Sequence, residues 1–181
     1  GAGERLREAA LSLYLERGFE QTMVADIAER AGVTPRTFFR YFADKREVLF
    51  DDSSSLEEES LAVLDGMPAA SALEATSAVL DTVAQLVGRD RELARMRQAV
   101  IMANADLRER ELIKLASMSA VLADRLRMRG IGDIEASLAA ETSIAVFRVA
   151  ISRWVNTAED RDLQDVIRET MGRLRTLTAP G

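Results

Sequence analysis

The sequence predicts an all-α protein. Helix-favouring Ala, Leu, Glu and Arg dominate the 181 residues, while aromatic residues make up only 5%. Turn-forming residues are few, with 10 Gly and 3 Pro. Apolar residues recur at helical spacing along most of the chain. No segment shows a clear alternation of apolar and polar residues, which a half-buried strand requires.

Four short helices are expected in the N-terminal part of the chain. The first carries apolar residues at the i, i+3, i+4 and i+7 positions and ends before Gly18. Thr22 is the expected N-cap of the second helix, and Thr34, followed by proline at the first helical position, begins the third. Asp44 and Glu47 have the spacing of a capping box at the start of the fourth. The expected ranges are 5–17, 22–31, 35–42 and 44 onward.

Longer helices are expected in the rest of the chain, where they form a second domain. The acidic and serine-rich stretch 51–59 is either the solvated end of the fourth helix or a loop. Short polar or glycine-containing segments separate the later helices. The expected domains are 1–50 and 51–181, and the expected later helices are 70–87, 90–103, 106–129, 133–156 and 161–177.

Missing residue types exclude several classes of enzyme. The chain has no Cys and no His, so it lacks disulfides, zinc-thiolate sites and the Ser-His-Asp triad. Neither of its lysines, Lys45 and Lys114, follows a glycine, which excludes the Walker A phosphate loop. We therefore expect no cofactor and no metal. An enzyme that uses carboxylates alone is the remaining alternative, although the acidic residues mostly fall at helix caps and on polar faces.

The chain also lacks the signals of membrane insertion and export. No apolar run approaches the ~18 residues of a membrane span, and the first residues contain no signal-peptide core. A cytoplasmic protein with no membrane partner is therefore expected.

Charge is distributed unevenly along the chain. The whole chain has a net charge of −6, yet residues 1–50 carry as many basic as acidic groups. Between residues 34 and 46, four cations stand against the single carboxylate of Asp44. A local cationic patch on an acidic body suits a protein that contacts phosphate in one place and repels it elsewhere.

The segment 22–45 has the pattern of a helix, a tight glycine-containing turn and a second helix. In this geometry the second helix can lie in the DNA major groove while the first braces it. Arginine can donate two hydrogen bonds to guanine, and threonine offers a hydroxyl and a methyl group to bases. The residues expected to face outward are Thr34, Arg36, Thr37 and Arg40. The residues expected to form the inner core are Leu6, Leu13, Phe19, Ile27, Ala31, Val33, Phe38 and Phe42.

Residues from about 6 to 49 resemble the DNA-binding domain of the tetracycline-repressor (TetR) family of bacterial transcription regulators. The matching pieces are RGF at 17–19, DIA at 26–28, AGV at 31–33, TFFRYF at 37–42 and DK at 44–45. The resemblance implies a ligand-responsive repressor that binds a near-palindromic operator as a homodimer. A helical protein-interaction adaptor that has lost DNA binding is the alternative.

The resemblance also implies a role for each matching residue. Some fall on the helix that reads bases, and others fall on positions that contact the DNA backbone. Phe39 departs from the family, since many members have at this position a tyrosine whose hydroxyl reaches phosphate; apolar packing on sugar or a thymine methyl replaces that contact, or the contact is lost. For the two arginines a solvated charged face is the alternative. The expected DNA-binding residues are Thr22, Thr34, Pro35, Arg36, Thr37, Phe39, Arg40, Tyr41 and Lys45.

The segment 133–156 is apolar on two opposite helical faces, one through Ile134 and Val149 and the other through Phe147 and Trp154. Such a helix cannot rest on a single surface. We expect it to pack, together with the last helix, against the same helices of a second subunit. Burial of both helices within one larger monomer core is the alternative. The expected interface residues are Leu138, Thr142, Ala145, Val149, Val166, Ile167, Thr170, Met171 and Leu174.

The helices between about residues 70 and 156 are expected to enclose the site of a small apolar effector, as the resemblance implies. Methionine and aromatic side chains provide adaptable apolar walls, although each of them can equally be core. The surroundings of Arg148 and Trp154 are similar to members with fatty-acyl-CoA-type ligands. The expected ligand-binding residues are Met96, Gln98, Met102, Asn104, Met118, Phe147, Arg148 and Trp154.

Overall fold

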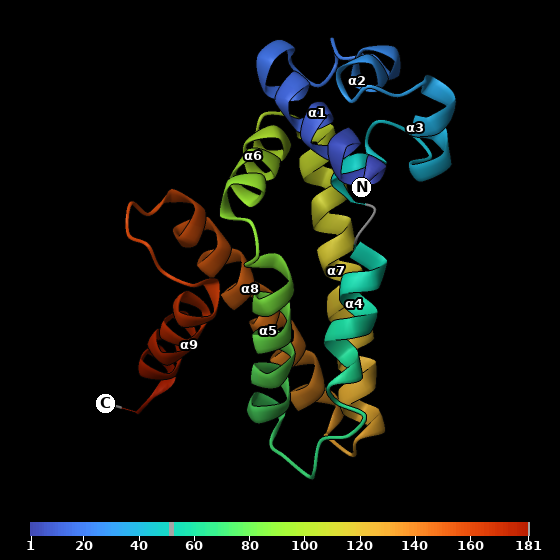
Figure 1. The fold of residues 1–181 in the computed structure, drawn as a ribbon. Helices are drawn as coiled ribbons and strands as arrows, with labels where there is room; N and C mark the ends of the chain where they lie inside the picture. Colours follow the sequence, from blue (N-terminus) through green and yellow to red (C-terminus); the bar gives the residue numbers. More distant parts are fainter. Residues whose placement is uncertain (51–52, 181) are drawn as a thin grey trace. The chain divides into compact units, whose positions relative to one another are not determined.

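The computed structural model describes residues 1–50 and 53–180, and all of its regular structure in this range is helical (Figure 1). The all-α prediction is therefore confirmed. The helices are α1 (Ala2–Arg17), α2 (Val24–Arg30), α3 (Pro35–Tyr41), the 3₁₀ helix η1 (Glu47–Leu49), α4 (Ser53–Ala62), α5 (Ala72–Val87), α6 (Arg91–Met102), α7 (Ala105–Met128), α8 (Asp133–Asn156) and α9 (Leu163–Thr178).

Most predicted helix boundaries agree with the structure within a few residues, but two starts were wrong. Met23, not Thr22, occupies the N-cap of α2, and its backbone N–H donates to the Asp26 carboxylate at 3.1 Å. Asp44 does not begin an α-helix. Its carboxylate accepts from the backbone of Arg46 and Glu47, and only the short 3₁₀ helix η1 follows. Residues 51 and 52 of the acidic stretch lie outside the described residues, and the following residues form α4.

The chain forms two compact units. Unit 1 consists of Gly1–Ser54 and Glu92–Glu111, and unit 2 consists of Ser55–Arg91 and Leu112–Gly181. The predicted domain boundary at residue 50 remains a prediction. The chain leaves unit 1 near this point, but it returns to unit 1 for residues 92–111.

Unit 1 is held together by one apolar core and by arginine contacts. The expected inner-core residues are buried in it, with Val33 partly buried, and α6 and α7 add Val100, Ile101 and Leu107. Arg97 donates to the Leu49 carbonyl at 2.8 Å and forms an ion pair with Glu111 at 2.8 Å. The first contact joins α6 to the end of η1, and the second joins α6 to α7.

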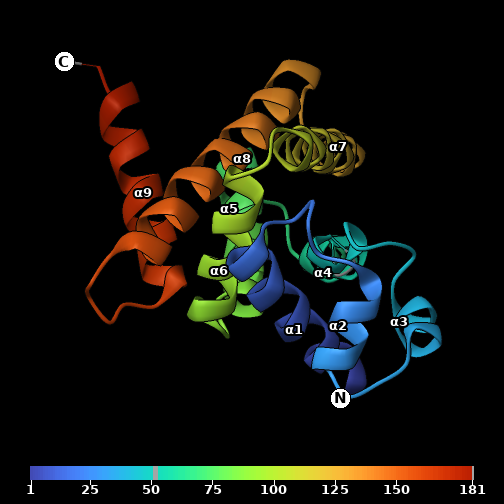
Figure 2. The ribbon, with the colours of Figure 1, turned by 90° about the horizontal axis from the view of Figure 1, so that it is seen from above.

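In unit 2, α5, α8 and α9 pack side by side (Figure 2). The inner face of α8 contains Trp154, which is buried and donates its indole N–H to the Arg161 carbonyl at 2.8 Å. Between α8 and α9, the guanidinium groups of Arg153 and Arg161 bind Glu169 and lower its pKa to about 2. In the described part of the chain, no helix is both long and apolar enough to cross a membrane.

Candidate nucleic-acid interface

The turn before α3 is built from residues that dictate its geometry. Gly32 adopts a φ of 69°, which favours glycine, and the Val33 N–H donates back to the Ala28 carbonyl at 2.9 Å. Thr34 then caps α3, because its Oγ1 accepts from the Thr37 N–H at 3.2 Å, and Pro35 follows at the first helical position. The turn thus fixes where α3 starts.

The inward face of α3 fixes its orientation. Phe38 is fully buried, and its ring centroid lies 5.5 Å from that of Phe42 and 5.4 Å from that of Phe39. A buried phenylalanine of this kind contributes several kcal/mol to stability. Because Phe38 is held in the core, the opposite side of the helix must face solvent.

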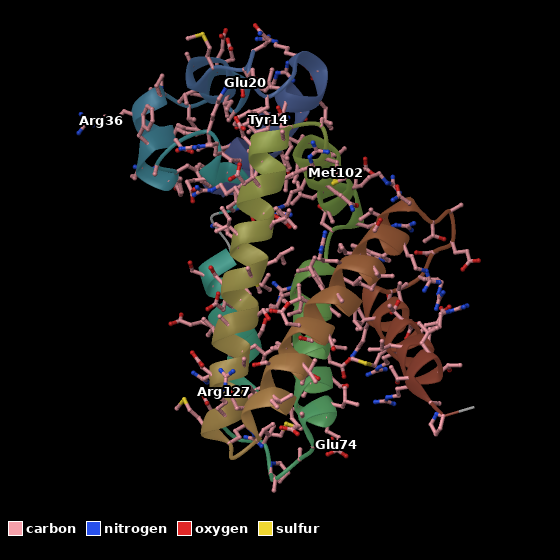
Figure 3. All side chains as sticks on the ribbon, turned by 180° about the vertical axis from the view of Figure 1, so that it is seen from behind. Tyr14, Glu20, Arg36, Glu74, Met102 and Arg127 are labelled. Atoms are coloured by element: carbon pink, nitrogen blue, oxygen red, sulfur yellow. The ribbon has the colours of Figure 1, made fainter. Side chains whose placement is uncertain are left out.

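The outward face of α3 presents cationic, hydroxyl and aromatic groups. Arg36 and Arg40 are exposed, and the Arg36 side chain points away from the ribbon (Figure 3). The Arg40 guanidinium lies 5.2 Å from the ring centroid of Tyr41. Neither arginine forms an ion pair with another described residue. Phe39 is 58% exposed although it is a large apolar side chain. Thr34 and Pro35 are also exposed, while Thr37 is half-buried.

Thr22 has a structural position instead of a surface one. Its side chain is 1% exposed, and its hydroxyl donates to the carbonyls of Gly18 at 2.9 Å and Leu13 at 3.3 Å. These bonds satisfy carbonyl groups at the end of α1. Thr22 was expected to cap α2 near a phosphate; because its side chain is buried and bonded within unit 1, the structure does not support a DNA contact of this side chain, and Thr22 is left out of the candidate interface.

Lys45 is likewise used inside unit 1. Its Nζ donates to the carbonyls of Phe19 at 2.7 Å, Thr22 at 3.2 Å and Glu20 at 3.3 Å. Its own carbonyl accepts from the Tyr14 hydroxyl at 2.6 Å, and burial raises the pKa of Tyr14. An ammonium group has three hydrogens to donate, and these carbonyls take all three. The Lys45 ammonium therefore fastens its loop to the loop between α1 and α2, and the geometry does not support the expected contact with the DNA backbone.

Replacing Lys45 by alanine is expected to lower the free energy of unfolding of unit 1 by about 1–3 kcal/mol, because partly buried carbonyls lose a charged donor. Urea unfolding followed by circular dichroism measures this change, with the exposed Arg36→Ala variant as the control of unchanged stability. If the variant keeps its stability but the slope of log K for DNA binding against log salt concentration falls by about one unit, Lys45 contacts a phosphate after all.

The predicted ligand-binding residues are not gathered within one unit. Met96, Gln98, Met102 and Asn104 belong to unit 1, whereas Met118, Phe147, Arg148 and Trp154 belong to unit 2. The positions of three of them argue against a role in a pocket wall. Met102 and Arg148 are exposed, and Trp154 is buried with its indole N–H already bonded. Met118 and Phe147 are half-buried, and Gln98 has a buried Oε1 without a described partner.

Two surface hollows of unit 2 were not anticipated from the sequence. One, of about 240 Å³, lies between α7 and α8 and is lined by Ser119, Ala120, Arg127, Ser137 and Glu141 among others. The other, of about 360 Å³, lies between α4 and α7. Neither is lined by a predicted ligand residue. Small side chains on facing helices create the first hollow, a feature that sequence periodicity does not reveal.

The predicted interface residues divide between the two helices. On α8, Leu138 and Val149 are 62% and 53% exposed, and Ala145 is also exposed, while Thr142 is half-buried. On α9, Leu174 is half-buried, but the other four predicted residues face the core of unit 2. For these four the monomer-core alternative describes the structure better, because α9 packs its apolar stripe on α5 and α8. They are Val166, Ile167, Thr170 and Met171.

A short helix with an exposed cationic face, set by a tight turn on a supporting helix, defines a helix-turn-helix DNA-binding protein. Comparison with known families agrees. The model for "Bacterial regulatory proteins, tetR family" matches residues 6–51, and the model for "MftR C-terminal domain" matches residues 69–179. The chain belongs to the TetR family, and it is a DNA-binding transcriptional regulator.

Individual relatives extend over both units. The HTH-type transcriptional regulator TcmR of Streptomyces glaucescens is 36% identical over 173 residues, which cover 89% of this chain and 76% of TcmR. The fatty acid metabolism regulator protein of Bacillus subtilis is 26% identical over 168 residues, covering 86% of this chain and 84% of that protein. The crystal structure of B. subtilis FadR in complex with stearoyl-CoA has the same fold, with a TM-score of 0.69 at 22% identity, covering 94% of this chain and 96% of FadR.

Proposed function

We propose that the chain is a homodimeric repressor that reads a near-palindromic operator through α3 and releases it when a small apolar effector binds. The observation that carries this proposal is the outward face of α3. There, two arginines without ion-pair partners among the described residues stand beside an exposed aromatic ring. A protein-interaction adaptor that has lost DNA binding has no need for exposed arginines without ion-pair partners on α3.

The chemistry of the α3 face supports base reading. Arg36 lies in the first turn and Arg40 one turn later, so both guanidinium groups project from the same side of the helix. Each can donate to guanine O6 and N7, and Phe39 offers an apolar surface to a thymine methyl or a sugar. We assign these three residues to the operator contact, with Thr34, Pro35, Thr37 and Tyr41 around them.

The proposed homodimer uses the outward face of α8. An apolar stripe exposed on a long helix is unusual for a monomer, and burial against a second copy removes it from water. A two-fold dimer presents two recognition helices to two half-sites about 34–36 Å apart along DNA. A near-palindromic operator follows from that symmetry.

The proposed effector has an acyl chain. B. subtilis FadR, which has the same fold, was crystallised with stearoyl-CoA. Met118 and Phe147 supply half-buried apolar surface in unit 2 that an acyl chain can contact. Titrating stearoyl-CoA into the operator complex tests this part, because release of DNA at micromolar effector supports it and retention at every concentration contradicts it.

Alanine at Arg36 or at Arg40 is expected to weaken operator binding by about 1–3 kcal/mol and to relax sequence preference, because each removes a base contact. Gel shifts on the DNA upstream of the chain's own gene and on random duplex measure both effects. Arg108→Ala on α7 is the matched control, since Arg108 is exposed and its side chain has no described partner. Equal losses on operator and random duplex would contradict base reading, and no binding to either DNA by the unchanged chain would favour the adaptor.

A further inference from the structure

The outward face of α8 has an ordered arrangement of charge as well as apolar surface. Successive residues of an α-helix are 100° apart around its axis, which places Ile134 and Ala145 along the middle of this face. Glu141 and Arg148 lie along one edge of the face. Leu138 and Val149 lie toward the other edge. Glu141 also lines the hollow against α7, which identifies the charged edge as the one on the α7 side. The six residues named above are all exposed, whereas Ser137, Thr142 and Ser152 on the same side of the helix are half-buried.

The two charged residues on this edge have no described ion-pair partner within the chain. Glu141 and Arg148 are seven positions apart, about 10.5 Å along the helix, which is too far for them to pair with each other. Arg153, one to two turns further along α8, is by contrast paired with Glu169. An acid and a base without partners on one edge of an apolar face are suited to meet groups of another molecule.

Two-fold symmetry brings these groups together. When two copies of a helix cross antiparallel on a two-fold axis that lies in the interface, each edge meets the same edge of the partner with its direction reversed. Glu141 then faces Arg148 of the partner subunit if the helices cross midway between these positions. The same crossing places Leu138 against Val149 of the partner subunit.

Both pairs require the same crossing point. The midpoint of Glu141 and Arg148 and the midpoint of Leu138 and Val149 both fall within one residue of Ile144. The small side chain of Ala145 lies on the face at this point, where it allows two helix axes to approach to about 8–10 Å. One register therefore satisfies the charged edge and the apolar edge together.

We propose that α8 pairs antiparallel with α8 of a second copy, and that reciprocal Glu141–Arg148 ion pairs across the two-fold axis select a self partner. The proposal rests on the homodimer proposed above and names the residues that set its register. Like charges placed opposite each other in an interface cost several kcal/mol, so the reciprocal pair excludes related chains with another charge pattern.

Charge reversal provides a direct test. Glu141→Arg creates two Arg–Arg contacts in its homodimer, and Arg148→Glu creates two Glu–Glu contacts. Each single variant is expected to raise the dissociation constant of the dimer at least about tenfold, as measured by analytical ultracentrifugation. An equimolar mixture of the two variants restores both attractive pairs, and so does the double variant. Both are therefore expected to recover the dimer.

The matched controls reverse charge at exposed positions of α7, with Glu109→Arg and Arg108→Glu, which should leave the dimer unchanged. Circular dichroism verifies that each variant is folded. Single variants that dimerise like the unchanged chain, or a mixture that stays monomeric, would overturn the ion-pair register. Leu138→Glu separates this failure from failure of the dimer itself. If Leu138→Glu dissociates the dimer while the charge variants do not, the face is correct and the register is wrong; if none of them does, the face is not the interface.

Discussion

Replacing Phe38 by alanine is expected to lower the free energy of unfolding of unit 1 by about 3–5 kcal/mol and to abolish operator binding. Phe38 is fully buried and in contact with Phe42 and the ring of Phe39. A loss of this size approaches the whole stability of a small domain, which is about 5–15 kcal/mol. Without this anchor, α3 has no fixed orientation from which to present Arg36 and Arg40.

The adjacent residue offers a matched control. Phe39→Ala removes the same atoms one position further on, but from a side chain that is 58% exposed. We expect its stability to change by at most about 0.5 kcal/mol, as at other surface positions, while its operator affinity falls. Guanidinium unfolding and gel shifts on both variants measure the contrast. Equal losses of stability in the two variants would contradict the assignment of Phe38 to the core and Phe39 to the DNA interface.

The end of α1 and the start of α3 could be predicted from the sequence because local signals determine them. Pro35 fixes one backbone angle, Gly32 allows a positive φ, and Thr34 caps the next turn, so each residue acts on its own neighbours. The periodic apolar residues of α1 and α3 likewise indicated which side would be buried. Such short-range physics does not depend on the rest of the fold.

The uses of Thr22 and Lys45 could not be predicted in the same way. Both side chains carry groups that can bind phosphate, and both sit close to a helix start. Their actual partners are backbone carbonyls in and just after the last turns of α1, up to 26 positions away. Only the folded chain brings those carbonyls within hydrogen-bonding distance. A polar side chain near a predicted DNA-binding surface therefore indicates a DNA contact only when the structure also shows that the side chain is exposed.

The last two helices show the same limit in another form. The apolar stripe of α9 and the outward stripe of α8 look alike in sequence, and both were expected at a subunit interface. Met171 is buried against its own unit, whereas Leu138 remains exposed. Periodicity reveals that a face is apolar, but it does not reveal which neighbour covers it.

Replacing Leu138 by glutamate is expected to convert the proposed homodimer to monomers and to weaken operator binding by about 10²–10⁴-fold. The substitution places two carboxylates in a face that must be desolvated on pairing. A monomer then binds each half-site separately and loses the high effective concentration that a second, linked recognition helix provides. Sedimentation and gel shifts on full and half operators measure both effects.

Affinity for a half operator separates the proposed cause from misfolding. Leu138 is 62% exposed and lies in unit 2, so the variant should keep the α3 surface and bind a half-site as the unchanged chain does. Ile113→Glu on α7 is a matched control, because Ile113 is also largely exposed but lies on a different helix, and it should leave operator binding unaltered. If Leu138→Glu were a monomer that retained full operator affinity, a dimer would not be needed to bind the two half-sites. The proposal of a near-palindromic operator would then be wrong as well.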